Sequence, residues 1–454
     1  MRKGNARFGK RDMGYVQTLN SLVLGLFASG EPGFWLDPSD LSTMYQDSAG
    51  TTPVTAVEQP VGRINDKSGR GCNFTQSTAG VRPVLSARVN LLTKTELWTA
   101  PWAKGTGGIT STTLSTAPDG TNTACTILLA AGAASHQFFQ LSSTAGTTLT
   151  NSVIAKAGTA SWLGLGFDSS VQTDGAFFDL TNGVKGTVAA GTTATINPLP
   201  GYAGWYICTV QRTYTSAQRY IGIEPHTADN QSPTFTAAGT ETIQVWHPDQ
   251  RPSDQATGLI PTYQRVNTST DYDTAGFPLY LSGNGTQWMQ CASQDYTGVN
   301  KIMLCGGIRK KSDAALAVVF ELSPTIASNN GAVLLSAPNS AAANLNFSSK
   351  GTTQVDNVVT PYTSPNTTVL TGLGDISAPS NIVRVNGAQV GSVSSTQGTG
   401  NYGNYAGYMF ARAGTSYFLT GNIYQLIARG STVASNAAQI SAAESWTDLK
   451  TRAY

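Results

Sequence analysis

Alternating hydrophobic and polar residues dominate this chain. From residue 34 onward, short segments in which every second residue is apolar recur, and residues such as Gly, Asp, Asn and Thr separate them. Two clear examples are GAFFDL and GWYICTVQR. Alternation places successive side chains on opposite faces of a strand, so these segments predict half-buried β-strands. Many short strands with turn residues between them are typical of sandwiches and jelly rolls, and the pattern predicts an all-β protein.

The predicted strands fall into two series. The first lies between residues 90 and 265 and includes HQFFQLSS, SWLGLGF, RYIGIEP and ETIQVWH, and the second follows residue 270, from PLYLSG to NIYQLIARG. In the second series, Asn386 and Gly387 separate IVRV from AQVGSV, which favours a two-residue hairpin turn. Only the last segment, NAAQISAAESWTDLKTRAY, is predicted to be helical, because apolar residues recur there every three positions: Ile440, Ala443, Trp446 and Leu449.

Composition excludes several classes of protein. A length of 454 residues favours about two or three domains. Charged residues make up 12% of the chain, with 28 basic against 26 acidic, so we expect no nucleic-acid partner. No apolar run reaches the roughly 18 residues that a membrane span needs, and we expect no membrane insertion. Five widely spaced cysteines predict neither a disulfide framework nor a zinc site, and we expect no cofactor and no metal.

Motifs in two separated parts of the chain resemble one family. Before residue 89 these motifs are WLDPSDL, DKSG and VRPVLS, and after residue 276 they are FPLYLSGNGTQWM, IVRVNGAQVG, YAGYMFAR and FLTGNIYQLIARG. In this order they resemble the concanavalin A-like lectin/glucanase (LamG-like) modules of tailed-bacteriophage structural proteins. Ser282 stands where the family pattern usually has Asp. The resemblance implies one β-sandwich built from both parts.

The intervening sequence resembles a different module. Its motifs NLLTKTELW, APDGTNTA, NSVIAKAG and GWYICTV are similar to the carbohydrate-binding-like jelly roll of phage tail and fibre proteins, whereas VWHPDQ at 245–250 departs from that pattern. The expected fold class is therefore all-β, with two jelly-roll/β-sandwich domains, one inserted in the other, an extended N-terminal arm and a short C-terminal helix. The expected boundaries are 1–33 for the arm, 34–88 and 266–454 for the outer domain, and 89–265 for the insertion. Two sequential domains are the alternative, with 34–88 as a shared linker.

The first 33 residues are basic and then apolar. A segment with so short an apolar part is expected to stay extended alone, and to order on an acidic surface of another virion protein. The residues expected to anchor it are Arg2, Lys3, Arg7, Lys10, Arg11, Leu22, Leu24 and Phe27. A secretory signal is the alternative, although polar residues interrupt its apolar part.

Catalytic patterns are weak in this sequence. Glycan hydrolases of the concanavalin-like fold use paired carboxylates on one strand, but Glu321 in VVFELSP stands alone. His247, next to Trp246, is predicted to end a strand rather than to act as a base. Asp271 and Asp273 could contribute to a calcium site, and an Asx-turn is the alternative. We therefore predict that the protein is not an enzyme.

A Gly-rich loop offers a candidate ligand site. The sequence GTGNYGNYAGY brings Tyr402 and Tyr405 together with Asn401 and Asn404. Aromatic faces can stack on sugar rings while amides bond sugar hydroxyls, so these four residues predict glycan binding. The alternative is that Tyr408 begins a strand and packs inward, which leaves two exposed tyrosines without a special role.

These patterns predict a non-enzymatic virion protein of a tailed bacteriophage, made in the host cytoplasm. We expect the protein to be a tail fibre or a head fibre and to form a homotrimer. Its N-terminal arm is expected to bind other virion proteins (tail, adaptor or capsid). Its expected ligand is host cell-surface polysaccharide. A glycan-degrading tailspike and a purely structural decoration or neck protein are the alternatives.

Overall fold

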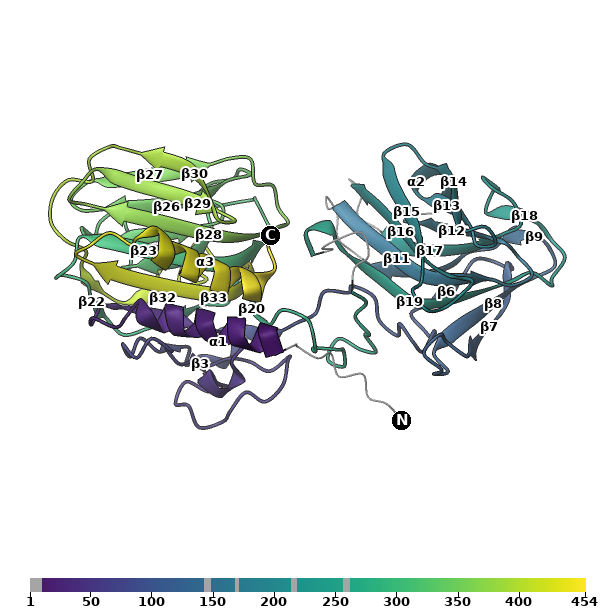
Figure 1. The fold of residues 1–454 in the computed structure, drawn as a ribbon, viewed down its shortest axis with the longest axis horizontal. Coiled ribbons are helices and arrows are strands. Elements are labelled where there is room, and N and C mark those ends of the chain that lie inside the picture. The colour runs from purple at the N-terminus through teal and green to yellow at the C-terminus, as the bar shows by residue number, and fades with distance from the viewer. Residues whose placement is uncertain (1–9, 143–147, 168–170, 214–218, 256–261) are drawn as a thin grey trace. The chain divides into compact units, whose positions relative to one another are not determined.

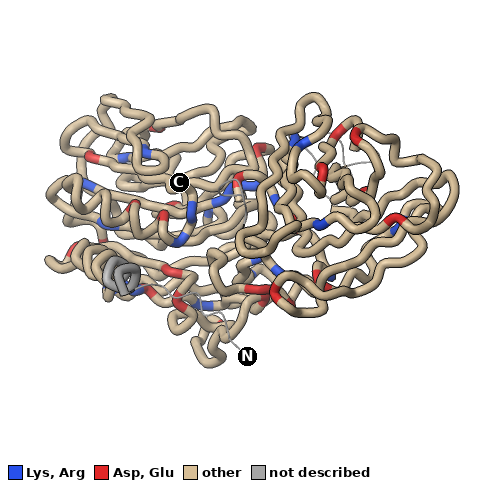
Figure 2. The backbone as a smooth tube through the Cα atoms, turned by 45° about the vertical axis from the view of Figure 1, so that its right-hand side comes forward, with Lys and Arg blue, Asp and Glu red and all other residues tan. Residues whose placement is uncertain are grey.

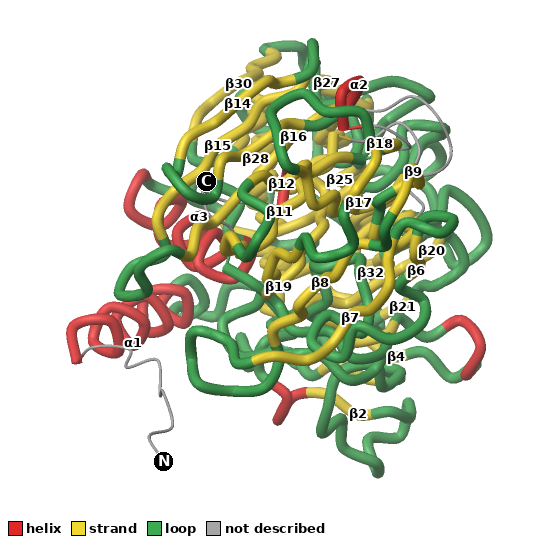
Figure 3. The backbone as a smooth tube through the Cα atoms, turned by 90° about the vertical axis from the view of Figure 1, so that its right-hand side faces the viewer, coloured by secondary structure: helices red, strands yellow, loops and turns green. Residues whose placement is uncertain are grey.

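Strands make up most of the regular structure, as Figures 1 and 3 show. The computed structural model describes residues 10–142, 148–167, 171–213, 219–255 and 262–454. The predicted all-β class is confirmed. The chain divides into two compact units: unit 1 comprises Met1–Ala87 and Pro278–Tyr454, and unit 2 comprises Arg88–Phe277.

Unit 1 is built from two large antiparallel sheets. One sheet has the order β30 (Ala388–Val393), β29 (Ser380–Val385), β28 (Asn366–Asp375), β23 (Lys301–Lys310), β33 (Thr420–Ser431), β20 (Tyr280–Asn284) and β5 (Val84–Ser86), and β1 (Gly33–Leu36) also pairs with β33. The other has the order β2 (Met44–Tyr45), β3 (Arg63–Ile64), β4 (Phe74–Thr75), β21 (Met289–Gln290), β32 (Gly407–Met409), β24 (Val318–Leu322), β25 (Val333–Ser336), β26 (Leu345–Lys350) and β27 (Gln354–Val359). A further short pair joins β22 (Gln294–Asp295) to β31 (Asn404–Tyr405).

The two segments of unit 1 share one core. The first strand, β1, pairs with the last, β33, so that Phe34 lies opposite Ala428. The ring of Phe34 meets Phe74 at 5.2 Å and Phe320 at 5.1 Å between centroids, in edge-to-face contacts. All three rings are buried. Neither segment could fill this core by itself, because each provides rings that the other covers.

Unit 2 has two six-stranded antiparallel sheets. The first contains β14 (Val184–Val188), β13 (Ala176–Asp179), β12 (Trp162–Gly166), β17 (Arg219–His226), β10 (Phe138–Ser142) and β6 (Ala103–Lys104). The second contains β15 (Thr192–Pro198), β16 (Trp205–Thr213), β11 (Thr148–Ala157), β19 (Thr242–Pro252), β8 (Ala124–Leu129) and β7 (Ile109–Ser115). A short pair joins β18 (Thr234–Ala237) to β9 (Gly132–Ser135). The core between the sheets includes Trp98 and Trp102, and Trp102 stacks on Phe138 at 5.0 Å.

The beginning and the end of unit 2 are tied together. The amide N–H of Val89 donates to Oε1 of Gln264 at 2.8 Å, and Asn90 Nδ2 donates to the Gln264 carbonyl at 2.9 Å. In unit 1, Ser86 of β5 lies opposite Tyr280 of β20. The chain thus leaves unit 1 and returns to it through neighbouring strands, which is the geometry that domain insertion requires.

The hairpin turn predicted at Asn386 and Gly387 is confirmed. Strand β29 ends at Val385 and strand β30 begins at Ala388, and these two residues lie opposite each other. Two residues therefore remain for the turn. Asn386 has φ 50° and Gly387 has φ 77°. Both values lie in the left-handed region that a type I′ turn needs, and Asn-Gly tolerates it best.

Unit 1 also carries the two longer helices. The described helices are α1 (Lys10–Gly25), α2 (Val171–Asp174) and α3 (Ala437–Thr451), with 3-10 turns at Leu41–Thr43, Ala79–Val81 and Ser253–Gln255. The helix predicted at the C-terminus is confirmed as α3. Asn436 caps it, and Gln439 completes a capping box. Its Ala443 and Trp446 are buried against the outer face of the eight-stranded sheet.

The expectation of an extended N-terminal arm is wrong for residues 10–25. These residues form α1, which packs beside α3 (Figure 1). Leu19, Val23 and Phe27 are buried in a cluster with Trp35, Ile427 and Trp446. The apolar residues are spaced so that one helix face meets the sheet and α3, and burial there offsets the ordering entropy. Phe27 is 2% exposed, so its side chain is not available to a partner.

Basic and acidic residues are interspersed in the part of the chain that the structure describes. Most positions in Figure 2 are neither basic nor acidic. This distribution fits the nearly balanced composition. No helix among the described residues is both long enough and apolar enough to cross a membrane.

Candidate functional site

A β-bulge distorts strand β19 of unit 2 at His247. In the pairing of β11 with β19, Ile154 lies opposite Trp246, but Ser152 lies opposite Asp249, so two residues of β19 face one residue of β11. His247 has φ 52°, a left-handed conformation that few non-glycine residues adopt. A bulge re-aims side chains that would otherwise alternate between faces. His247 therefore lies inside the strand, not at its end as the sequence predicted.

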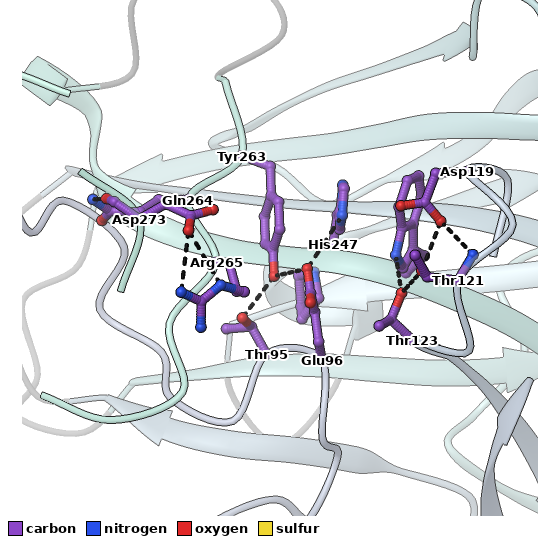
Figure 4. A network of polar contacts seen from close by, with 12 residues as sticks. Thr95, Glu96, Asp119, Thr121, Thr123, His247, Tyr263, Gln264, Arg265 and Asp273 are labelled. Atoms are coloured by element: carbon purple, nitrogen blue, oxygen red, sulfur yellow. Dashed lines mark hydrogen bonds and ion pairs between the residues drawn. The ribbon is translucent and has the colours of Figure 1, made fainter. Parts of the chain in front are cut away.

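The bulge allows three aromatic rings to stack in sequence. The centroids of Trp246 and His247 lie 3.4 Å apart, and those of His247 and Tyr263 lie 3.7 Å apart at an interplanar angle of 13°. Figure 4 shows the His247 and Tyr263 rings side by side. Trp246 Nε1 donates to Oγ1 of Thr123 at 3.0 Å, which fixes the inner end of the stack to the turn after Asp119.

A carboxylate lies at the edge of this stack. Oε1 of Glu96 is 3.3 Å from the Tyr263 hydroxyl and 3.5 Å from Nε2 of His247. The Tyr263 hydroxyl is also 2.6 Å from Oγ1 of Thr95. The side chains of Glu96 and His247 remain 18% and 20% exposed, so a ligand in solvent can reach their edges. Thr95, Glu96, Trp246, His247 and Tyr263 together are called the Glu96 site.

Burial sets the electrostatics of the Glu96 site. Desolvation lowers the pKa of His247, against the opposing effect of the nearby Glu96 carboxylate. Desolvation, with the Glu96 charge added to it, raises the pKa of Tyr263 well above its usual value. At neutral pH the imidazole and the phenol are therefore uncharged. The site then offers one carboxylate acceptor next to neutral groups that can donate or accept.

Next to the Glu96 site, the outer face of the same sheet carries a small buried apolar cluster. Trp246 packs in one cluster with Ile154 and Trp205. Tyr202, in the turn before Trp205, is 42% exposed. On the same face, the hydroxyls of Thr195 and Thr209 lack a hydrogen-bond partner within the described part of the chain. Trp205, Trp246 and both hydroxyls are buried, so this cluster does not itself present a surface to a ligand.

The carboxylates considered for calcium have another partner. Arg265 lies 3.2 Å from Oδ1 of Asp271 and 3.1 Å from Oδ1 of Asp273, and the Arg265–Asp273 contact is visible in Figure 4. A guanidinium thus occupies the space between the two acids that a cation would need. Among the described residues, no group of three His, Cys, Asp or Glu side chains could hold a metal ion.

The predicted glycan loop does not offer two free tyrosines. Tyr402 is 1% exposed, and its hydroxyl lies 2.8 Å from Ser349 inside the core of unit 1. Its predicted role in stacking on a sugar is therefore wrong, because neither face is accessible. The hydroxyl of Tyr405 donates to the Asn330 carbonyl, and Nδ2 of Asn401 donates to the Thr297 carbonyl at 2.6 Å. Asn404 is exposed on β31.

The predicted anchoring residues are separated. Arg2, Lys3 and Arg7 lie outside the described residues, and Lys10 and Arg11 belong to the first turn of α1. Leu22 and Leu24 are 51% and 43% exposed, unlike the buried Phe27. The two leucines keep the exposure that docking requires, and their anchoring role stays a prediction.

Glu321, which the sequence showed as a single acid, is a structural carboxylate. It is buried, Nε of Arg412 donates to its Oε2 at 2.8 Å, and the amide of Ile326 donates to its Oε1 at 2.6 Å. Burial raises its pKa, and Arg412 opposes this effect. With both oxygens engaged, Glu321 has the contacts of a core ion pair.

The sequence did not reveal Glu96, Thr95 or Tyr263 as site residues. Glu96 and Tyr263 are 167 positions apart, and no motif joins them. One signal was present: VWHPDQ, at the position of the bulge, departs from the jelly-roll pattern that the neighbouring motifs resemble.

Comparisons with known proteins give no family for the chain. No family model and no curated protein matches the sequence. Three similar solved structures are a SAP-like pentraxin from Limulus polyphemus, the CBM40 of a Ruminococcus gnavus IT-sialidase bound to α2,3 sialyllactose, and domain 4 of the Geobacillus stearothermophilus arabinanase AbnA with arabinotriose. Their identities are 11%, 12% and 15%, and their TM-scores are 0.29, 0.25 and 0.28. They cover 37%, 33% and 38% of this chain, and 80%, 93% and 78% of their own chains. At these TM-scores the likeness carries no functional argument.

Proposed function

We propose that the protein binds carbohydrate and that the Glu96 site of unit 2 is the contact. The observation that supports this most is the ordered stack of Trp246, His247 and Tyr263 with a partly exposed carboxylate at its edge. A sugar presents closely spaced hydroxyls, and Glu96 can accept from two of them. The neutral His247 and Tyr263 edges supply further donors and acceptors.

The strained backbone at His247 favours a functional role over a packing role. A left-handed histidine within a bulge costs stability of order 1–3 kcal/mol, and such positions concentrate at binding sites. On a regular strand the neighbouring side chains of Trp246 and His247 would point to opposite faces of the sheet, so this stack requires the bulge. The bulge holds the edge of the His247 imidazole next to the Glu96 carboxylate. Because both side chains are already fixed, a ligand would bind without the entropy cost of ordering them.

The biological setting of this binding is the second part of the proposal. The motifs of 34–88 and 266–454 resemble phage structural modules, which supports a role as a tail fibre or head fibre that attaches to host polysaccharide. In this role the protein acts as a homotrimer on the virion and performs no catalysis. A glycan-degrading tailspike is the alternative that release of reducing ends would reveal.

The test compares two variants of the Glu96 site with the parent protein on an array of bacterial surface glycans. Glu96→Gln and Tyr263→Phe should each weaken binding to the strongest array ligand about tenfold, because each removes one hydrogen bond to a polar ligand. Asp356→Asn, which removes an exposed carboxylate of unit 1, is the matched control and should bind normally. The free energy of unfolding of unit 2 should fall by no more than about 1 kcal/mol in the two site variants, which lose contacts within the site, and it should not change in Asp356→Asn.

The array can also contradict the proposal. Full binding by both Glu96-site variants would move the contact to another surface. Failure of the parent protein to bind any glycan would favour the purely structural decoration or neck protein.

A further inference from the structure

The Glu96 carboxylate has no cationic partner. Its Oε1 contacts the Tyr263 hydroxyl and the His247 imidazole, and its Oε2 makes no hydrogen bond or ion pair within the described part of the chain. Because desolvation lowers the pKa of His247, the imidazole is uncharged near neutral pH and does not balance the Glu96 charge. The Glu96 side chain is 18% exposed, so its negative charge is partly desolvated and still open to a ligand.

A second carboxylate lies near the same stack of rings. Asp119 is exposed in the turn between β7 and β8, and its charge, like that of Glu96, acts on His247. In Figure 4 it lies on the side of His247 away from Tyr263. Oδ1 of Asp119 accepts from the amide and the hydroxyl of Thr121 at 3.0 and 2.7 Å, and no Lys or Arg of the described ranges pairs with it. Two unbalanced negative charges therefore act on a ligand at the edge of His247.

The basic residues around the stack are engaged with other acids. Their ion pairs are Arg251–Asp249, Arg265–Asp271 and Arg265–Asp273. The charge of Lys94, two positions before Glu96, acts on Asp271. This contrast identifies Glu96 and Asp119 as the acids whose charge is left for a ligand.

The backbone fixes Glu96 before any ligand binds. Glu96 lies in a tight turn in which the amide of Trp98 donates to the Lys94 carbonyl at 3.0 Å. The amide of Thr95 donates to the Val266 carbonyl at 3.0 Å, and the Trp98 ring is buried in the core of unit 2. A carboxylate held in this way loses little entropy when a ligand binds.

We propose that the Glu96 site selects sugars that carry a free, protonated amino group. This inference rests on the proposed function, because it names the class of carbohydrate that the site takes. The ammonium group donates to Oε2 of Glu96, and sugar hydroxyls bond the edges of His247 and Tyr263. A charge-assisted hydrogen bond of this kind is roughly twice as strong as a neutral one. A neutral sugar leaves the Glu96 charge unbalanced, and the like charge repels an acidic sugar.

Titration calorimetry on the full-length protein near neutral pH tests the proposal with four probes. They are the glucosamine trimer, the same trimer with every amine acetylated, the glucose trimer of the same linkage, and methylammonium. The glucosamine trimer should bind about tenfold more tightly than the other trimers, because it alone forms the charge-assisted contact. Its affinity should fall as NaCl is raised. Methylammonium should bind more weakly than the glucosamine trimer, because it has no hydroxyls.

Two variants locate the selection. Glu96→Gln keeps the size of the side chain and removes its charge, so it should weaken binding of the glucosamine trimer about tenfold, to the level of the acetylated trimer. Asp119→Asn should weaken this binding by about two- to threefold, because Asp119 acts through its field. Asp356→Asn removes an exposed carboxylate of unit 1 and is the matched control, which should keep the full preference.

Equal binding of the three trimers would overturn the inference and leave carbohydrate binding in place. Binding of methylammonium as tight as that of the glucosamine trimer would mean that the site recognises charge alone, and would also overturn it. A tenfold preference that Glu96→Gln retains would place the selection outside the Glu96 site. In each case the array result for Tyr263→Phe still decides the proposed function.

Discussion

Units 1 and 2 are both antiparallel β-sandwiches, but they differ in chain connectivity and in the side chains that they present. Unit 1 combines two stretches of chain that are separated by 190 residues, from Arg88 to Phe277, and its central rings come from both stretches. Unit 2 is one continuous stretch whose two ends are hydrogen bonded to each other. Unit 1 places ion pairs around a pocket on the outer face of its eight-stranded sheet. Unit 2 places stacked rings and a carboxylate at the edge of a sheet.

This difference indicates how stability and binding are divided. In unit 1, rings such as Phe320 and Tyr402 pack in the core and are inaccessible to a ligand. In unit 2, a bulge removes rings from the regular alternation and brings them beside Glu96. Aromatic content alone therefore does not locate a ligand site, because a buried ring contributes area to the core and offers no face.

The largest test of the comparison removes unit 2. Replacing residues 88–277 by a short Gly/Ser linker should leave unit 1 folded, because β5 and β20 are already paired at the junction. Calorimetry should show one cooperative transition within about 5 °C of the unit 1 transition in the full-length protein. Residues 88–277 expressed alone should also unfold cooperatively. Aggregation of both fragments would contradict two independent units.

The next test disrupts the core that joins the two stretches of unit 1. Phe320→Ala removes a ring in contact with Phe34 and Phe74, and should lower the free energy of unfolding of unit 1 by about 3–5 kcal/mol. The unit 2 transition should not move. Val358→Ala, at a 44% exposed position on β27, is the control. Equal shifts of both transitions would mean that the units unfold together.

A smaller effect is expected at the tyrosine that the sequence assigned to ligand binding. Tyr402→Phe loses the hydrogen bond to Ser349 and should cost about 1 kcal/mol of unit 1 stability. Glycan binding should be unaffected, because the ring is inaccessible. Chemical denaturation and the glycan array measure the two outcomes. Lost binding with unchanged stability would restore the loop as a ligand site.

The smallest effect concerns pH and unit 2. Since burial lowers the pKa of His247, the unfolded chain binds its proton more readily than the folded one. Stability should therefore fall as pH decreases below about 6.5, the ordinary histidine pKa. Asn tolerates the left-handed backbone at this position. His247→Asn should therefore reduce the change of unfolding free energy with pH by a fraction of a kcal/mol per pH unit. The groups that face His247 and could mask the change are Glu96, Asp119 and Asp249. An identical pH profile for the variant would contradict a neutral, desolvated imidazole.

Much of the fold could be predicted because it depends on local patterns. Alternation at stretches such as Ala176–Asp179 specifies strands, Asn386 and Gly387 specify a turn, and the spacing of Ala443 and Trp446 specifies a helix face. The N-terminal prediction failed because it treated residues 1–33 in isolation. α1 is stabilised by burial against α3 and the sheet, and residues such as Ile427 and Trp446 in these contacts lie more than 400 positions away.

The sequence by itself determined the all-β class, the positions of the turns and the balance of charge, since these follow from the identity of near neighbours. Only the tertiary structure decided which rings are buried and which polar groups meet. Tyr402 and Tyr263 are both tyrosines in Gly- or polar-rich surroundings, yet one lies inside a core and the other stacks on His247 beside Glu96. Contacts between residues far apart in sequence depend on sheet register and on one bulge, and neither leaves a local pattern that could be read from the chain.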